Sequence, residues 1–280
     1  MRAAAVQLNS KADIRRNLAT AEALVRAAAA DGATLVALPE RLDVRGTTED
    51  YERAAEPLET SEAVRWAREL ARELNIDLIA GSISERRPGH DKLSNTSVHV
   101  DPQGDIKAAY RKVHLFDVTV GDTDYRESDS DEPGDELVVS EAADCTRIGL
   151  SVCYDVRFPE LYRILALNGA LVLTVPANFT RATGEAHWEV LLRARAVENQ
   201  AFVIAPAQSG EYPPGMPAYG NSMIVDPWGE VLARANPDEP AFVAADLDFG
   251  RLAEIREKLP SLQNRAPGAY RWPSAVEAHV

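Results

Sequence analysis

Cysteine and histidine are scarce in this chain of 280 residues, and neither is arranged for a structural role. The two cysteines, Cys145 and Cys153, are too few for a disulfide framework and do not form a CxxC metal knuckle. No two of the five histidines stand at HxH or HxxxH spacing, so the sequence does not support a metal centre. It also lacks a GxGxxG or GxxxxGK(S/T) phosphate loop and a GxSxG elbow. We therefore expect neither a metal nor a cofactor.

Long apolar runs are absent as well. No stretch approaches the roughly 20 apolar residues that cross a bilayer, and the first ten residues, MRAAAVQLNS, lack the apolar core and cleavage site of a signal peptide. Acidic residues outnumber basic ones by 44 to 30, and the net charge of −14 disfavours nucleic acid and anionic membranes as partners. We expect a soluble cytoplasmic protein that acts on small molecules.

Lysine is nearly missing. Only Lys11, Lys92, Lys107, Lys112 and Lys258 stand among the 30 basic residues, and the rest are arginine. Salt screens the repulsion between the many acidic side chains, because the Debye length falls to about 3 Å at 1 M salt. The composition therefore predicts a halophilic source, although moderately acidic enzymes are also common in organisms that do not live in salt.

The chain does contain enough apolar side chain for one large core, because hydrophobic residues make up 45% of it. Apolar runs of strand length alternate with segments of helical period. The predicted strands are 3–8, 34–38, 77–83, 97–100, 147–152, 171–175, 202–207 and 222–225, and the predicted helices are 14–30, 61–74, 158–168 and 185–199. This alternation predicts an α/β fold with a largely parallel sheet covered by helices.

No linker divides the chain, so residues 1–280 are predicted to form a single domain. The two halves share an order of elements without an evident sequence repeat, and the polar segment 117–135 between them is predicted to be a loop. Residues 260–280 show weak periodicity and are predicted to be a C-terminal tail that packs at a subunit interface.

Cys153 is the first residue whose position indicates chemistry. It ends an apolar strand and precedes a predicted helix, so its side chain projects from the carboxyl edge of the sheet, where open α/β sheets bind ligands. Backbone amides at such a turn stabilise a thiolate and an oxyanion. The competing interpretation is a small buried hydrophobe, the usual role of a free cysteine, and it also applies to Cys145.

Three charged residues complete a candidate site. Glu40 directly follows an apolar run, and desolvation there would raise its pKa toward use as a general base. Lys112 lies between apolar neighbours, and its ammonium could stabilise an oxyanion. Glu127 lies in the acidic loop, and taken alone it would be interpreted as a solvated charge. Glu40 taken alone would be interpreted as the cap of a helix or turn. With Cys153, however, these residues suffice for acyl transfer at a C–N bond without histidine.

From residue 4 to about residue 270 the chain resembles the nitrilase superfamily, the carbon–nitrogen hydrolases. The resemblance implies a four-layer αββα sandwich, often paired as a homodimer or higher homo-oligomer. It also implies a catalytic triad of Glu40, Lys112 and Cys153, supported by Glu127 as a second glutamate. The segments that carry it are ALPE (37–40), YRKVHLFD (110–117), ES (127–128), PG (133–134), GLSVCYD (149–155), VRFPEL (156–161), AHWE (186–189), RARAVENQ (193–200) and VDPWGE (225–230).

The motifs around the cysteine and in the AHWE segment are most similar to the Nit-type amidase branch. That branch implies release of ammonia from a small linear amide through a cysteine acyl-enzyme, with an ω-amide of a dicarboxylic acid or a deaminated-glutathione type of amide as substrate. Hydrolysis of N-carbamoyl amides is the alternative, and nitrile hydrolysis is a weaker one. The intact triad disfavours a protein that only binds.

Five further residues are predicted to contact the substrate, namely Tyr154, Arg157, Asn178, Phe116 and Trp188. The backbone N–H of Tyr154 would join Lys112 at the oxyanion, and Arg157 with Arg181 could hold a substrate carboxylate. Alternatively, Arg157 forms a structural ion pair with Asp155 or Glu160, and the aromatic residues belong to the core.

The sequence departs from the family pattern directly after Glu40. Arg41, Leu42 and Asp43 replace the small or aromatic-containing stretch that is common there, at what we expect to be the substrate mouth. YGNS at 219–222 replaces the YGHS of near relatives. Because both segments shape the predicted site, the sequence does not predict which acyl group is accepted.

Overall fold

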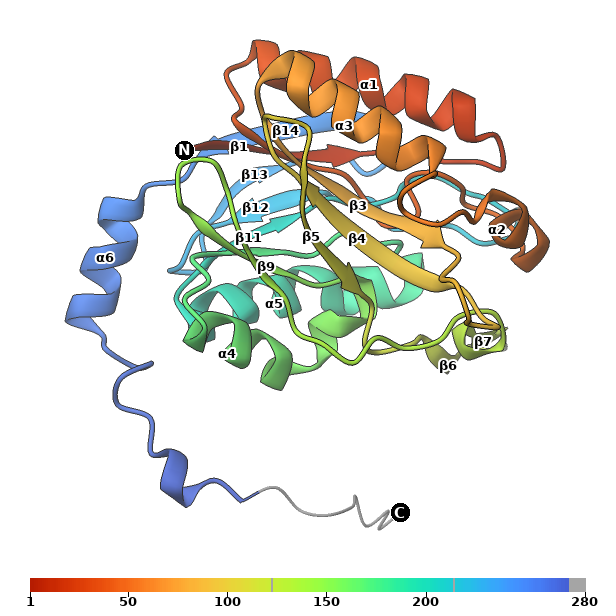
Figure 1. Ribbon diagram of the computed structural model, residues 1–280. Helices are drawn as coiled ribbons and strands as arrows, with labels where there is room; N and C mark the ends of the chain where they lie inside the picture. Colours follow the sequence, from red (N-terminus) through yellow and green to blue (C-terminus); the bar gives the residue numbers. More distant parts are fainter. Residues whose placement is uncertain (122, 214, 272–280) are drawn as a thin grey trace.

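The computed structural model describes residues 1–121, 123–213 and 215–271. Two six-stranded sheets face each other, and helices cover the outer face of each sheet (Figure 1). The layers therefore run helix, sheet, sheet, helix, which confirms the predicted αββα sandwich.

The first sheet comes from the N-terminal half of the chain and one C-terminal strand. Its order is β14-β1-β2-β3-β4-β5, in which β1, β2 and β3 run parallel and the other pairings are antiparallel. The strands are β1 (Arg2–Gln7), β2 (Leu35–Ala37), β3 (Asp77–Glu85), β4 (Ser94–Val100), β5 (Ile106–Arg111) and β14 (Ala241–Asp246).

The second sheet repeats this plan with the following part of the chain. Its order is β13-β12-β11-β10-β9-β8, and β9, β10 and β11 are the parallel strands. The strands are β8 (Val139–Glu141), β9 (Arg147–Leu150), β10 (Val172–Thr174), β11 (Phe202–Ala205), β12 (Met223–Val225) and β13 (Val231–Arg234).

Both sheets are thus mixed, and the prediction of one largely parallel sheet is wrong. The parallel strands are mostly apolar and are buried except at the first residue of β1 and of β9, whereas β5, β13 and β14 are half-exposed, with polar residues among the apolar ones. A search for apolar runs finds the first kind and overlooks the second. The predicted loop 117–135 likewise contains a hairpin of β6 (Asp117–Val120) and β7 (Thr123–Arg126), followed by the 3₁₀ turn η1 (Glu127–Asp129).

Amphipathic helices make the two outer layers. In α1, which has the predicted bounds, the Asp13 side chain accepts the N–H groups of Arg15 and Arg16 at the N-terminus. The helices over the first sheet are α1 (Ile14–Ala30) and α3 (Glu62–Leu74), and those over the second are α4 (Pro159–Leu167) and α5 (Arg181–Asn199). Two further helices, which were not predicted, are α2 (Thr48–Ala54) and α6 (Phe249–Lys258).

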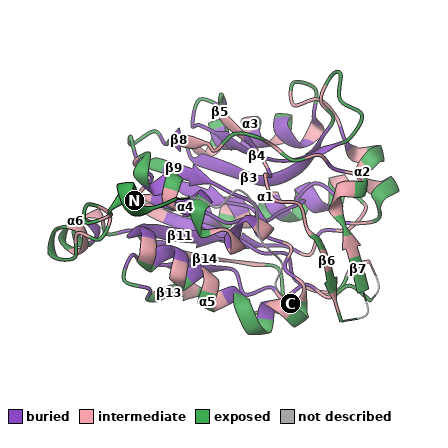
Figure 2. Ribbon diagram, turned by 90° about the horizontal axis from the view of Figure 1, so that it is seen from below, coloured by how far each residue is buried: buried purple, intermediate pink, exposed green. Residues whose placement is uncertain are grey.

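The core has an inner and an outer part because side chains alternate along each strand. On β1, Ala3 and Ala5 face the second sheet, whereas Ala4 and Val6 face α1 and α3. Figure 2 shows both sheets buried, with exposed residues on the outer surfaces of the helices and at the loops. Burial on both faces explains why the parallel strands are continuous apolar runs.

The C-terminal segment leaves the body of the protein after α6. Residues 261–271 are mostly exposed, with one 3₁₀ turn, η3 (Pro267–Ala269), and Figure 1 shows them extending away from the sandwich. Residues 272–280 lie outside the described residues, so packing of the tail at a subunit interface stays a prediction. Among the described residues, no helix is long and apolar enough to cross a membrane.

Candidate active site

The predicted triad converges at one end of the sandwich, although its members come from distant parts of the chain. Glu40 follows β2, Lys112 follows β5 and Cys153 follows β9, so each lies just beyond the carboxyl end of a strand. Glu127 joins them from η1, directly after the β6–β7 hairpin. All four line a cavity of about 480 Å³.

Close backbone packing sets the position of Glu40. A side chain at Gly81 on β3 would meet the Leu38 carbonyl oxygen at 1.7 Å, so only glycine lets the segment before Glu40 pass this close. Arg41 then turns the chain with φ of 55°. From the segment after this bend, Arg41, Arg45, Gly46 and Thr47 line the cavity.

Cys153 is held in a strained turn. Its φ is 48°, in the left-handed region that few residues other than glycine adopt, and its backbone N–H donates to the Pro176 carbonyl at 2.8 Å. The 3₁₀ turn η2 (Cys153–Arg157) begins at this residue. The turn thereby places the thiol against the cavity beside the first amide groups of η2.

Lys112 lies between the two glutamates. Its Nζ donates to Glu40 Oε1 at 3.0 Å and to the Glu127 carboxylate at 2.7 and 3.0 Å. Burial alone would lower the pKa of Lys112, but the carboxylates of Glu127 and Glu40 raise that pKa well above its ordinary value. The ammonium therefore stays charged at neutral pH.

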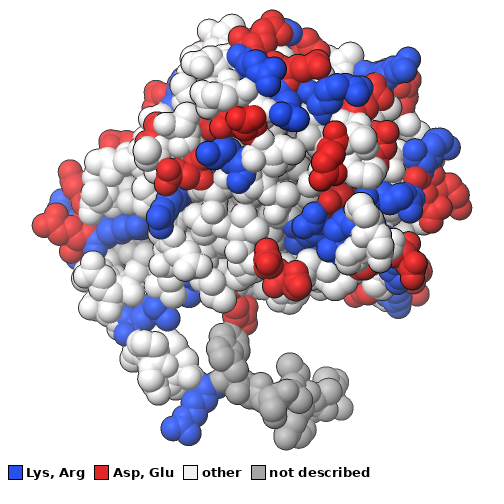
Figure 3. Space-filling model, in the orientation of Figure 1, with Lys and Arg blue, Asp and Glu red and all other residues white. Residues whose placement is uncertain are grey.

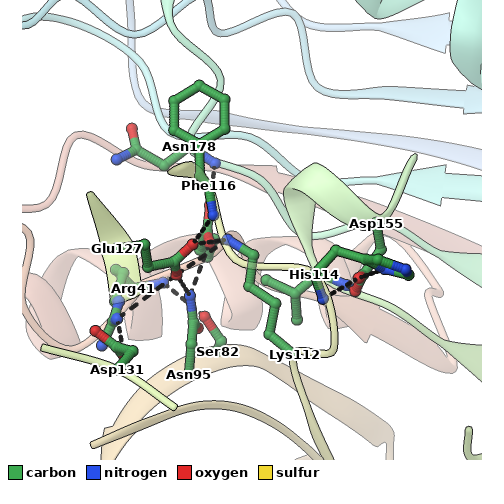
Figure 4. Close-up of polar contacts among 12 residues, drawn as sticks. Arg41, Ser82, Asn95, Lys112, His114, Phe116, Glu127, Asp131, Asp155 and Asn178 are labelled. Carbon is green, nitrogen blue, oxygen red and sulfur yellow. Dashed lines mark hydrogen bonds and ion pairs between the residues drawn. The ribbon is translucent and has the colours of Figure 1, made fainter. Parts of the chain in front are cut away.

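Glu127 is tied from several sides (Figure 4). Besides Lys112, the backbone N–H of Phe116 donates to it at 2.7 Å and Asn95 Nδ2 at 3.0 Å, and a guanidinium nitrogen of Arg41 lies 4.0 Å away. Burial opposes its ionisation, but Lys112 and Arg41 hold the pKa of Glu127 below its ordinary value. Glu127 is therefore a fixed anion that positions the lysine.

Glu40 shares Lys112 and Asn95 with Glu127, has one further donor of its own, and lies beside the thiol. One oxygen accepts Asn95 Nδ2 at 2.8 Å, and the other accepts the backbone N–H of Asn178 at 2.7 Å. Burial and the neighbouring Glu40 carboxylate raise the pKa of Cys153 well above its ordinary value, while Lys112 opposes that rise. The Cys153 side chain is therefore a neutral thiol with a carboxylate next to it.

Asp155 joins the cysteine turn to the lysine segment. It accepts the Tyr110 hydroxyl at 2.7 Å, the backbone N–H of Val152 at 2.8 Å and His114 Nδ1 at 2.8 Å (Figure 4). Asp155, Asn95, His114 and the role of Arg41 were not predicted. Asp155 and His114 do lie inside the matching motifs, but Asn95 stands in a plain strand and carries no local signal.

Three of the five predicted substrate contacts line the cavity, namely Phe116, Tyr154 and Asn178. Trp188 does not, and the prediction that it contacts substrate is wrong. It is wholly buried, packs on Phe179 with the ring centroids 5.0 Å apart, and donates its Nε1–H to the Asn221 carbonyl. The other interpretation, core packing, is the one that the structure supports.

The arginines predicted to hold a carboxylate also lie elsewhere. Arg157 is not among the lining residues; its guanidinium lies 5.8 Å from the ring centroid of Tyr154, contacts His187 Nδ1 at 3.3 Å and forms no ion pair with Asp155 or Glu160. Arg181 is exposed at the start of α5. The side chain that does reach the cavity from the unusual segment after Glu40 is Arg41, whereas Leu42 is wholly buried in the core.

Within the residues that the structure describes, no group of three or more His, Cys, Asp or Glu side chains could hold a metal ion. The cavity itself offers a thiol, a neighbouring carboxylate and a fixed ammonium. These groups are suited to nucleophilic acyl transfer, and they lie at one end of an αββα sandwich. This combination of fold and site defines a class of hydrolases that act through cysteine.

Comparison with known proteins agrees with that class. Residues 2–257 match the family model described as carbon-nitrogen hydrolase, so the chain belongs to this family within the nitrilase superfamily. It is 42% identical over 267 residues to "Deaminated glutathione amidase" of Synechocystis, covering 94% of this chain and 97% of the relative. It is 39% identical over 270 residues to "Omega-amidase NIT2" of Homo sapiens, covering 96% of each.

Similar folds are known from solved structures. Saccharomyces cerevisiae Nit3, described as a member of branch 10 of the nitrilase superfamily, superposes with a TM-score of 0.85 at 32% identity. The match covers 93% of this chain and 94% of that one. The similarity therefore extends over the sandwich as a whole and is not limited to the motifs.

Proposed function

We propose that this protein is an amidase that releases ammonia from a small linear amide through a thioester on Cys153. The observation that carries the proposal is the Lys112 ammonium held between Glu40 and Glu127, beside a buried thiol that lines a cavity. The relatives described as amidases support the same reaction. These side chains would supply a nucleophile, a base and an oxyanion partner.

Acylation begins with the neutral thiol. As Sγ of Cys153 attacks the amide carbonyl carbon, its proton passes to Glu40, which avoids a free thiolate whose formation burial and the carboxylate disfavour. The carbonyl oxygen gains the negative charge, and Lys112 with the backbone N–H of Tyr154 stabilises it. Glu40 then protonates the nitrogen, the C–N bond breaks, and ammonia leaves a thioester.

Deacylation uses the same residues in reverse roles. Glu40, again a carboxylate, accepts a proton from a water molecule that attacks the thioester carbon. The tetrahedral intermediate collapses and its C–S bond breaks. The Cys153 thiolate takes the proton back from Glu40, and the carboxylic acid departs. Glu127 takes no proton in this cycle, because Lys112 and Arg41 keep its pKa low; it holds the ammonium at the oxyanion.

The test of this function compares substrates and seeks the intermediate. The enzyme is incubated with ω-amides of dicarboxylic acids, N-carbamoyl amino acids and nitriles, and ammonia release is measured for each. We expect release from the amides, and mass spectrometry after acid quenching should find an acyl adduct on Cys153. Absence of ammonia from every compound, together with no modification of Cys153 by iodoacetamide, would contradict the proposal and favour a binding protein.

We also propose that two copies of the chain pair through the outer faces of α4 and α5. These neighbouring helices expose apolar side chains, with Ile164 45%, Leu167 44% and Val190 60% exposed. A second copy would bury them and stack the two sandwiches. Light scattering should give a dimer or larger assembly, and Leu167→Glu with Val190→Glu should give monomers; a wild-type monomer would overturn this proposal.

The composition supports adaptation to salt. Figure 3 shows acidic side chains spread among basic ones over one face, and the whole chain carries a net charge of −14. Salt weakens repulsion between such charges. We expect the urea midpoint and the activity to rise from low to multimolar KCl, whereas full stability and activity at low salt would argue against the proposal.

A cytoplasmic location follows from the proposed chemistry. The nucleophile is a free thiol, and a second free cysteine, Cys145, is exposed. Free thiols persist where glutathione and thioredoxin keep proteins reduced. Fractionation of the source cells should find the activity in the cytoplasm, and recovery from the medium would oppose this assignment.

A further inference from the structure

The catalytic residues continue into a second ion pair (Figure 4). The Nη2 atom of Arg41 lies 4.0 Å from Glu127 Oε1 and 2.6 Å from Asp131 Oδ1. Five side chains thereby form a series in which negative and positive charges alternate, in the order Glu40, Lys112, Glu127, Arg41 and Asp131. None of the five is more than 14% exposed, so solvent screens their charges little. We refer to this group as the charge series.

Two neighbouring elements hold Arg41 in place. Its Nη1 donates to the Ser84 hydroxyl of β3 at 2.7 Å, and its backbone N–H donates to the Ser82 hydroxyl at 3.0 Å. Its guanidinium carbon lies 4.4 Å from the ring centroid of Tyr51 on α2. These contacts fix the cation at its place in the charge series.

Arg41 offsets a repulsion that Lys112 does not reach. The charge series contains three carboxylates and two cations, and without Arg41 the carboxylates of Glu127 and Asp131 would lie close together with no cation between them. Like charges in a desolvated site disfavour ionisation, so that one of the two carboxylates takes up a proton. If that group were Glu127, its ion pair with Lys112 would be lost.

The surroundings of the two groups agree with this account. Burial opposes the charge of Glu127, but Lys112 and Arg41 hold its pKa below the ordinary value. Burial also opposes the charge of Arg41, but Asp131 and Glu127 raise its pKa. Among the described residues, the charged and titratable side chains around Glu127 and Arg41 are Lys112, Glu40, Asp131, Asp43 and Tyr51, whose pKa burial raises.

We propose that Arg41 is a positioning residue of this active site: it separates Asp131 from Glu127, keeps Glu127 ionised and so holds the Lys112 ammonium at the oxyanion. The proposal rests on the proposed amidase function, because the oxyanion is that of the amide under attack. Arg41 acts through Glu127 and takes no proton in the reaction.

The sequence gives this pair a place of its own. Arg41 stands in the segment after Glu40 in which the chain departs from the family pattern, and its partner Asp131 lies 90 residues further on in the acidic loop. The acidic loop therefore brings an additional carboxylate next to Glu127, and Arg41 supplies the charge that offsets it.

The experiment measures kcat/KM against pH, with the amide that releases most ammonia in the substrate comparison. Because turnover needs Glu40 and Glu127 both ionised, the acidic limb reports whichever of them takes up a proton at the higher pH. Arg41→Met should move this limb to higher pH by about one unit or more, the effect of losing an adjacent arginine. Arg41→Lys should keep it close to its wild-type position, since the charge is retained.

Removal of Asp131 should reverse the shift. In the double variant Arg41→Met with Asp131→Asn, Glu127 no longer has a second carboxylate beside it, and Lys112 alone keeps it ionised. The acidic limb and the urea midpoint should both return toward wild type. An unmoved limb in Arg41→Met despite reduced turnover, or a double variant that regains stability while its limb stays shifted, would overturn the proposal.

Arg87 offers a matched control, because it holds the same loop by an ion pair. Its partner is Glu132, the residue after Asp131, and neither Arg87 nor Glu132 lines the cavity. Arg87→Met should leave the acidic limb and kcat unchanged. A shift equal to that of Arg41→Met would show that anchoring of the loop sets the pH profile, and would also overturn the proposal.

A second neutral variant keeps the proposal testable if Arg41→Met does not fold. Arg41→Gln retains an N–H donor for Ser84 and Asp131 but no charge, and we expect the same shift of the acidic limb. Absence of ammonia from every amide with the wild-type enzyme would instead refute the amidase function. That result differs from turnover whose pH profile ignores the charge at residue 41, so the two failures are distinguishable.

Discussion

Two buried polar clusters each include a side chain of β4, one near each end of the strand. At one end Asn95 of β4 contacts Glu40 and Glu127 beside the cavity. At the other end His99, four residues further along β4 and so on the same face, contacts Asp77 of β3 and Ser140 of β8. We refer to these groups as the open cluster and the closed cluster.

The closed cluster contains the residue types of a serine hydrolase. His99 lies 2.7 Å from the Ser140 hydroxyl and 3.0 Å from Asp77, whose carboxylate also accepts the backbone N–H of Ala143 at 3.1 Å. All three side chains are buried, however, and none of them lines the cavity. Because no substrate can reach the hydroxyl, this constellation ties the two sheets together and has no chemistry to perform.

Residue types alone therefore do not distinguish a catalytic cluster from a structural one. The closed cluster satisfies its hydrogen bonds internally, whereas the open cluster places a thiol and a carboxylate against a cavity. The open cluster and the closed cluster differ in whether a ligand can reach them and in the balance of their charged groups. Both differences can be tested by matched substitutions.

The largest difference concerns the two candidate nucleophiles. Cys153→Ala should lower kcat by about 10⁴-fold or more, as loss of a nucleophile does in hydrolases of this kind. Ser140→Ala should leave kcat unchanged and lower the free energy of unfolding by about 1 kcal/mol, the value of one hydrogen bond. Ammonia release and urea denaturation measure the two effects, and loss of turnover in Ser140→Ala would reverse the assignment of the clusters.

Next in size is the effect of removing the central cation. Lys112→Met leaves Glu40 buried without its ammonium partner and Glu127 with only the Arg41 guanidinium, 4.0 Å away, and should cost about 3–5 kcal/mol of unfolding free energy. Turnover should fall by about 10²–10³-fold as the oxyanion partner is lost. Adding Glu127→Gln should recover part of the stability and none of the activity. Recovery of activity in the double variant would show that Lys112 acts only as a structural cation.

A smaller effect is expected from the two β4 side chains. His99→Leu leaves the Asp77 carboxylate without its histidine partner and should cost about 1–3 kcal/mol of unfolding free energy, with unchanged kcat. Asn95→Leu should lower kcat as well, because Asn95 holds both active-site carboxylates. Equal effects of the two variants on kcat would erase the functional distinction between the ends of β4.

The smallest effect is in the pH dependence of stability. The pKa of Glu127 is lowered in the folded state, so its ionisation stabilises the protein above its unfolded pKa of about 4.3, and this contribution is lost as the pH falls through the lower folded value. The difference in urea midpoint between wild type and Glu127→Gln should therefore narrow below about pH 4. A difference that stays constant from pH 7 to pH 3 would contradict the lowered pKa.

Local patterns predicted much of the fold. The helix 14–30 and the parallel strands were found because burial on one or both faces leaves a periodic or continuous apolar signal. The half-exposed edge strands carry no such signal. Their pairing depends on strands distant in the sequence, as β14 pairs with β1, so no local window contains the information.

The candidate site likewise contains residues that the sequence predicted and residues that it did not. Glu40, Lys112, Glu127 and Cys153 were predicted because each lies in a motif that resembles a known family. Asn95 was missed because its importance lies in a partner far along the chain, Glu40, which is 55 residues away. Trp188 was misassigned because an aromatic side chain suits a core as well as a cavity wall.

By itself, the sequence determined the type of chemistry, because the residue types supply a nucleophile, a base and a cation whatever the fold of the chain. It also determined the acidic surface and the shortage of lysine against which Lys112 stands out. Only the tertiary structure decided which polar clusters open to a ligand and which charges are paired. Burial and ion pairing arise between segments that the sequence keeps far apart, and these raise the pKa of Cys153 and hold Lys112 between Glu40 and Glu127.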